Sequence, residues 1–187
     1  MRRFKPDRVP DPVIERILTT ATYAPSAHNR QPWRFVVVTA SAVKSRLAAE
    51  MADDFQHDLT QDRIDPAEIE RQVTRSKSRI QAAPVIIVLC MDSTEMDNYP
   101  DAKRKQAELA MAMQSVAGAG LQLLLAAHAE GLGGVWVCSP LFTPETVRKA
   151  LKLSEAWEPQ GMFFLGYPHD IPEARRRKPI QEISHYL

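Results

Sequence analysis

Cysteine is scarce in this chain, and its scarcity excludes two ways of stabilising a small protein. The 187 residues include only two cysteines, Cys90 and Cys138, which form no C-x-x-C pair. A disulfide framework needs more of them, and a structural zinc site with four thiolates needs four. A chain of this length buries roughly 70% of its unfolded surface, so we expect residues 1–187 to form a single domain without cross-links.

A large charge excess and the common catalytic motifs are also missing. The formal net charge is +1, which argues against a strongly basic nucleic-acid binder. The five histidines form no H-E-x-x-H motif, and no G-x-S-x-G sequence is present. We therefore expect no metal site and no catalytic side chain, and a redox activity would require an organic cofactor.

Long uninterrupted apolar runs are absent too. No window approaches the ~20 consecutive apolar residues of a membrane span, and no apolar run follows the charged residues 1–6 as in a secretory signal. The cytoplasm is the expected location.

Hydrophobic periodicity and breaker residues predict helices alternating with strands. Asp11 is expected to cap the first helix and Thr143 the last long one. The predicted helices cover residues 11–23, 41–55, 65–81, 101–130 and a stretch from 143, and the predicted strands cover 33–39, 84–90, 135–137 and 161–167. The strand at 84–90 is apolar throughout, which is typical of burial on both faces.

The segment 101–130 contains no proline and is apolar on nearly every side over its last two-thirds. Thirty helical residues span about 45 Å, more than a domain of this size needs for its own core. A helix that is apolar all round has to be buried all round. We therefore expect it to run through the centre and to face a second subunit, the alternative being the central helix of a monomer.

Basic clusters lie near both ends of the chain, at residues 2–5 and 175–178. Arginine side chains match the geometry of phosphate, although such clusters are often only solvated. The polar tail, residues 168–187, shows no core pattern, so it is either loose or wraps over a partner.

Two further segments have the composition of a ligand site. Between a helix and a strand, Pro25 and Pro32 bracket Ser26, Asn29 and Gln31, whose hydroxyl and amide groups suit the edge of a heteroaromatic ring. Glycines at 131, 133 and 134 permit close approach of a ligand to the backbone, or simply end a helix. They are not a dinucleotide fingerprint, because they close a helix instead of opening one.

In combination, these segments resemble the nitroreductase family of FMN enzymes. The order that carries the resemblance is Arg2-Arg3-Phe4, the P-S-x-x-N-x-Q-P-W block at 25–33, the long helix, Gly131-Leu132-Gly133-x-x-Trp136, and Gly166-Tyr167-Pro168 with its basic tail. Within the family, the chain looks most like the C-terminal flavin domain of the coenzyme F-420 gamma-glutamyl ligase.

The resemblance implies an α+β fold in which a mixed β-sheet is flanked by helices around the long central helix. It also implies an intertwined homodimer, with the tail 168–187 on the partner subunit. As an FMN-dependent NAD(P)H oxidoreductase, the protein would pass electrons through FMN to a small organic acceptor such as a nitroaromatic, a quinone or an enone. No nucleic acid or membrane partner is implied.

The resemblance also assigns cofactor-binding residues. The arginines would hold the FMN phosphate and ribityl chain, the loop residues would line the flavin, and the segment after the glycines would lie by the reactive edge of the ring. These residues are Arg2, Arg3, Ser26, His28, Asn29, Gln31, Trp136, Val137, Cys138, Ser139, Arg175 and Arg177. His28 alone is more often a surface histidine than a catalyst.

Two narrower readings stay open. One is a dedicated reductase of a dehydro precursor of the deazaflavin coenzyme F-420, with His28 and residues 56–58 as substrate contacts. The other is a flavin-binding protein without turnover.

Overall fold

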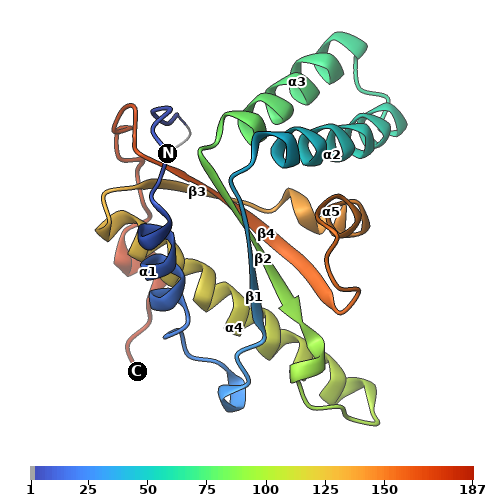
Figure 1. Cartoon of the computed structure of the whole chain (residues 1–187). Helices are drawn as coiled ribbons and strands as arrows, with labels where there is room; N and C mark the ends of the chain where they lie inside the picture. The colour runs from blue at the N-terminus through green and yellow to red at the C-terminus, as the bar shows by residue number, and fades with distance from the viewer. Residues whose placement is uncertain (1–2) are drawn as a thin grey trace.

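The computed structural model describes residues 3–187, so the predicted contact Arg2 lies outside the described residues. Four strands form one sheet in the order β1-β2-β4-β3, and helices cover both of its faces (Figure 1). The strands are β1 (Trp33–Val38), β2 (Val85–Asp92), β3 (Gly133–Val137) and β4 (Trp157–Gly166), and the α-helices are α1 (Asp11–Ala21), α2 (Ser41–Gln61), α3 (Pro66–Ala82), α4 (Ala102–Ala129), α5 (Pro144–Leu151) and α6 (Ile180–Ile183). The predicted α+β class is confirmed.

The expectation of a mixed sheet is wrong for the described residues, because all three strand pairs in the sheet are antiparallel. The antiparallel pair α2 and α3 returns the chain to the end of the sheet that β1 has just left, so β2 runs back along β1. The strands β2 and β3 run in the same direction across α4, but β4 lies between them. A parallel pair is therefore split by an inserted antiparallel strand.

The two faces of β2 build two separate parts of the core. Side chains of Val85, Ile87 and Leu89 pack with α1 and α4, whereas those of Ile86 and Val88 pack with α2, α3 and α5. Every residue of β2 is buried, as its unbroken apolar sequence predicts.

One predicted helix cap is wrong, and another is confirmed in position but makes no capping hydrogen bond. Asp11 is the first residue of α1, not its cap, and its carboxylate binds Arg8. Thr143 stands at the cap position of α5, but its hydroxyl makes no capping bond and is buried without a hydrogen-bond partner among residues 3–187. The helix predicted to end near Phe55 continues to Gln61, because α3 packs along its extension.

Helix α4 matches its predicted extent, but it is not buried on all sides in the single chain. One side, with Val116, Ala119 and Leu123, lies in the core. Along its surface α4 also carries a row of exposed apolar residues at spacings of four and eight, here called the α4 stripe: Leu109, Met113, Leu121 and Leu125, each 40–58% exposed. By length and composition alone α4 could cross a membrane, yet its buried side is part of the protein core.

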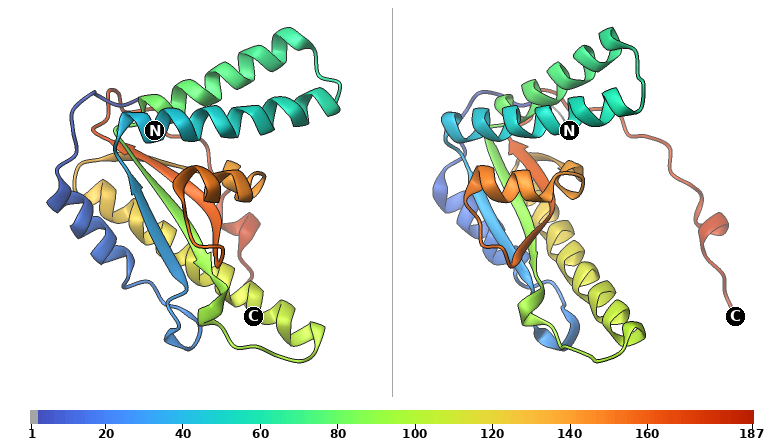
Figure 2. Two further views of the ribbon diagram at one scale, coloured as in Figure 1. Left: turned by 45° about the vertical axis from the view of Figure 1, so that its right-hand side comes forward. Right: turned by 90° about the vertical axis from the view of Figure 1, so that its right-hand side faces the viewer.

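The tail leaves the domain after β4. The right-hand view of Figure 2 shows it running away from the helices and the sheet, with α6 near its end. Its apolar side chains are exposed, including those of Ile180, Ile183 and Tyr186. Ile180 and Ile183 stand three residues apart in α6, on neighbouring positions of its surface, and Tyr186 follows beyond the end of that helix.

Candidate functional site

The polar loop between α1 and β1 is held rigidly by its own side chains. The Ser26 hydroxyl accepts a hydrogen bond from the backbone N–H of Gln31 at 3.0 Å. The Gln31 amide donates to Oδ1 of Asn29 at 3.3 Å. The Ser115 hydroxyl of α4 accepts from the N–H of Ala27 at 3.1 Å, so the loop is tied to the long helix.

The loop backbone is also strained. His28, Asn29 and Gln31 all have positive φ angles, between 52° and 54°, although none is glycine. Such residues cost about 1–3 kcal/mol each and persist where the surroundings impose the conformation. The three side chains are exposed, so the strain presents one imidazole and two amides to the outside.

Charged groups fix both sides of this loop. Arg30 pairs with Asp97, and Arg34 pairs with Asp92 at 3.2 Å. Burial raises the pKa of Asp92, but hydrogen bonds from the side chain and backbone of Thr94, together with Arg34, outweigh it and leave the pKa lowered. Asp92 is therefore an ionised anchor where β2 ends beside the loop.

The segment after the glycines divides its side chains between the two faces of the sheet. Trp136 packs against Phe163, with ring centroids 5.0 Å apart, on the α4 side. Its indole Nε1 is buried and has no hydrogen-bond partner in the part of the chain that the structure describes. Val137 points to the opposite side, and an added Cβ at Gly161 would collide with the indole of Trp136. Any contact of Trp136 with a ligand on the Val137 side would therefore come from its backbone.

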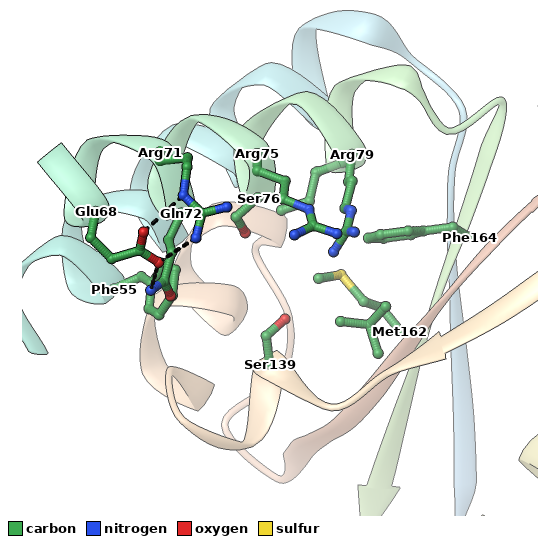
Figure 3. A pocket seen from close by; sticks show the side chains of 12 residues that line it. Phe55, Glu68, Arg71, Gln72, Arg75, Ser76, Arg79, Ser139, Met162 and Phe164 are labelled. Atoms are coloured by element: carbon green, nitrogen blue, oxygen red, sulfur yellow. Dashed lines mark hydrogen bonds and ion pairs between the residues drawn. The ribbon is translucent and has the colours of Figure 1, made fainter. Parts of the chain in front are cut away.

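Val137 and Ser139 line a hollow of about 450 Å³ between β3 and α3. Figure 3 shows the side chains of Arg75 and Arg79 reaching from α3 toward Met162, with Ser139 across from them. Cys138 and Ser139 also line a neighbouring, more apolar hollow of about 520 Å³ with Phe142 and Asp58. Residues 137–139, which the resemblance places by the reactive edge of the flavin ring, thus border two adjoining hollows.

The predicted phosphate ligands from the two ends of the chain come together. Arg3, Arg175 and Arg177 line one hollow of about 560 Å³ beside Val135 of β3. Arg3 binds Asp170 at 2.5 Å, and the pKa of Asp170 is lowered by His169 first and by Arg3 next. The hollow combines three guanidinium groups with two acidic residues, Asp170 and Glu173, and is suited to an anion that competes for Arg3.

Within one chain, the loop at residues 26–31 lies far from the hollow that is lined by the terminal arginines. The first residue of β1, Trp33, pairs with Met91, which pairs with Glu158 near the start of β4. The terminal arginines lie at the other end of β4, where Phe4 pairs with Pro168. Ten strand residues at roughly 3.3 Å each separate the two groups by about 30 Å along the sheet.

Three functional candidates on α3 escaped the sequence analysis: Arg71, Arg75 and Arg79. All three line the hollow beside Val137. Their spacing of four residues inside a predicted helix was the available signal, because it places them on one helical face. What lay opposite that face could not be predicted without the tertiary contacts.

The two cysteines differ in environment. Cys90 is fully buried in β2, and burial raises the pKa of its thiol to about 12. The thiol therefore stays protonated and unreactive. Cys138 is exposed at the start of the 3-10 turn Ser139–Leu141.

Known proteins resemble this chain over most of its length. Residues 1–167 match the nitroreductase family, a match that ends before Arg175 and Arg177. The 5,6-dimethylbenzimidazole synthase of Rhodospirillum rubrum is 31% identical over 188 residues, covering 94% of this chain and 82% of that protein. The NADH dehydrogenase of Thermus thermophilus is 27% identical over 207 residues, covering 98% of this chain and 89% of that protein. A Desulfovibrio desulfuricans structure described as a nitroreductase in complex with FMN has a TM-score of 0.74 and 25% identity, covering 100% of this chain and 90% of that one.

Proposed function

This chain belongs to the nitroreductase family, and from that premise we propose that it is an FMN-dependent oxidoreductase that uses NAD(P)H. The second substrate would be a small organic acceptor such as a nitroaromatic, a quinone or an enone. Support comes from the FMN in a structure 25% identical to this chain and from the NADH dehydrogenase among its relatives.

The observation that carries the proposal is the loop at residues 26–31. Three non-glycine residues are held at positive φ, and the hydrogen bonds of Ser26 and Ser115 maintain them there. Strain of this kind is retained where it positions groups for a ligand. The exposed amides of Asn29 and Gln31 supply donors and acceptors together, which match the alternating polar edge of a flavin ring.

We further propose that the site is completed by a second copy of the chain. The loop and the terminal arginines lie at opposite ends of the sheet, too far apart to hold one FMN within one chain. The loop is anchored at Ser115, on the same helix as the α4 stripe. Two copies packed through their stripes would place each loop beside the partner, and the exposed apolar tail would lie on the partner as well.

The candidate residues form three groups, each suited to a different part of an FMN molecule. Arg3, Arg175 and Arg177 would hold the phosphate, because guanidinium groups bind phosphate oxygens in pairs. Ser26, His28, Asn29 and Gln31 would line the ring. The backbone of Trp136, Val137, Cys138 and Ser139 would lie along the reactive edge of the ring.

Bound FMN would supply the two-electron redox chemistry, which explains why the chain needs no acid–base pair of its own. The chain itself would position the ring and the acceptor and would stabilise charge on them. A backbone donor near Cys138 and Ser139 would stabilise negative charge on a bound ring without reorganising. The apolar wall with Phe142 would keep water away from the acceptor.

The narrower resemblance to the deazaflavin domain remains a second candidate. Of the three predicted substrate contacts at residues 56–58, Asp58 lines the hollow beside Cys138, whereas Gln56 and His57 line others. Reduction of a dehydro-deazaflavin precursor, with no turnover of simple nitroaromatics, would favour this candidate. A protein that binds FMN but is never reduced would be a carrier.

An anaerobic stopped-flow titration tests the proposal. FMN-loaded protein is mixed with NADH or NADPH, and flavin absorbance is followed before and after adding a panel of acceptors. We expect bleaching by at least one nucleotide and reoxidation by at least one acceptor. A purified protein that takes up no FMN refutes the proposal.

A further inference from the structure

The hollow of about 520 Å³ beside Cys138 and Ser139, here called the acidic hollow, has two carboxylates in an otherwise mainly apolar lining. They belong to Asp58, on the last turn of α2, and Asp62, at its C-cap. Neither carboxylate forms an ion pair or a hydrogen bond with another described residue. No lysine, arginine or histidine is among the described residues that line the hollow. The hollow therefore attracts cations and repels anions.

A buried hydroxyl is a second and independent sign of a ligand at the acidic hollow. Thr143 borders the hollow at the start of α5 and is only 8% exposed. Its Oγ1 has no hydrogen-bond partner in the described part of the chain. A buried polar group without a partner is costly, and a bound molecule with a suitable oxygen would remove that cost.

Aromatic side chains give the acidic hollow walls that suit a flat molecule. Phe55 of α2 and Phe142 both border it, and Phe142 is 80% exposed on the turn that follows Ser139. Sites for small molecules commonly combine apolar and aromatic walls with a few polar groups. An aromatic ring bound there would stack against these side chains.

The acidic hollow adjoins the hollow that α3 lines with its arginines. Phe55, Ser76 and Ser139 line both spaces (Figure 3). Ser139 also belongs to the segment that would lie along the reactive edge of the flavin ring. A molecule in the acidic hollow would therefore lie next to that edge.

We propose that the acidic hollow binds the electron acceptor, and that Asp58 and Asp62 select its charge. The acceptor class is then a small aromatic molecule that is cationic or neutral, because an anionic one is repelled. The Thr143 hydroxyl donates a hydrogen bond to an oxygen of the acceptor. This inference rests on the proposed function, since it takes the segment 137–139 as the reactive edge of the flavin site.

The test uses three acceptors that share one ring and differ in charge: 4-nitrobenzoate, nitrobenzene and (4-nitrobenzyl)trimethylammonium. The FMN-loaded protein is photoreduced without nucleotide, and anaerobic stopped-flow absorbance gives a second-order rate constant of reoxidation for each compound. Reduction of one nitro group to a nitroso group and water takes two electrons and two protons, and so reoxidises one reduced flavin. Each compound is compared between proteins, because the three differ in intrinsic reduction potential.

The variant Asp58→Asn is compared with a matched control, Asp53→Asn. Asp53 lies on the same helix but lines a different hollow, so its replacement removes an equal charge away from the site. Asp58→Asn should raise the rate constant for 4-nitrobenzoate about threefold to tenfold and lower that for the cation similarly, since one nearby charge is lost. Nitrobenzene should not respond, and Asp53→Asn should match wild type.

Ionic strength gives a readout that a purely structural role of Asp58 would not move. Added salt should reduce the effect of Asp58→Asn on both charged compounds, because it screens exposed charges. An equal response of the anionic and cationic compounds to Asp58→Asn overturns the proposal. An equally large effect of Asp53→Asn also overturns it.

Thr143→Val tests the hydroxyl, because it keeps the shape of the side chain and removes the donor. It should lower the rate constants of all three compounds about threefold to tenfold, as for one lost hydrogen bond, and leave the charge preference unchanged. Thr143→Ser should restore the rates. Wild-type rates in Thr143→Val would overturn the role of this hydroxyl.

Equilibrium dialysis of the two charged compounds separates this inference from the proposed function. If the protein takes up no FMN, or if no nucleotide reduces it, the proposed function fails, but both dissociation constants can still be measured. Tighter binding of the cation, with a difference that Asp58→Asn reduces and Asp53→Asn does not, supports the acidic hollow as the binding site. Equal binding of the two compounds, or no binding of either, overturns it.

Discussion

The α4 stripe offers the sharpest test of a site shared by two chains. Replacing Leu121 and Leu125 together by glutamate places two charges at the C-terminal end of the stripe, where its residues are most exposed. The two leucines are 56% and 58% exposed in the single chain, so each has about 1–1.5 kcal/mol still to gain from full burial. Over two copies these leucines contribute about 4–6 kcal/mol to association, before any cost of burying charge.

Removing that contribution should raise the dimer dissociation constant by about 10³–10⁴-fold, since each 1.4 kcal/mol is a factor of ten. Light scattering coupled to size-exclusion chromatography measures the mass, and fluorescence quenching measures FMN affinity. We expect the double variant to be monomeric at micromolar concentration and to lose FMN, with its far-ultraviolet circular dichroism unchanged. Ile64→Glu, at the turn between α2 and α3, is the control for adding a charge at an exposed apolar position.

Two results would refute this reasoning. A wild-type protein that is monomeric at micromolar concentration would show that the stripe is not an interface. A monomeric variant that binds FMN with wild-type affinity would show that one chain holds the whole site, despite the separation of its parts along the sheet.

Three further predictions concern single residues. Arg177→Ala should weaken FMN binding by about 1.5–3 kcal/mol, as for a lost hydrogen bond to a charged group; unchanged affinity in a fluorescence titration would mean that the tail does not hold the phosphate. Gly161→Ala should lower the free energy of unfolding in urea by about 1–3 kcal/mol, because the new methyl displaces Trp136; an unchanged midpoint would contradict the packing. Because the pKa of Asp92 is lowered in the folded protein, its ionised carboxylate stabilises the fold above the unfolded pKa of about 3.9, and this stabilisation is lost as pH falls through the folded pKa. Below pH 5 the urea midpoint of Asp92→Asn should therefore change less with pH than the wild-type midpoint. Equal changes in the two proteins would exclude this role.

Much of the secondary structure could be predicted from the sequence because it depends on residues that are close along the chain. The burial of β2 followed from an unbroken apolar run, and the start of α3 followed from Asp65, whose carboxylate accepts from the N–H groups of Ala67 and Glu68. The cap assigned to Asp11 failed because Arg8 takes its carboxylate instead. Local chemistry thus predicts where an element lies more reliably than which partner each polar atom finds.

Sequence by itself determined the period of each element and the polar and basic segments that resemble an FMN enzyme, since both depend on residues close along the chain. Only the tertiary structure decided that β4 enters between β2 and β3, that the α4 stripe stays open, and that Arg75 faces Val137. The physical reason is that a helix or strand fixes the spacing of its side chains, whereas the surface each face meets is supplied by residues far away in the chain.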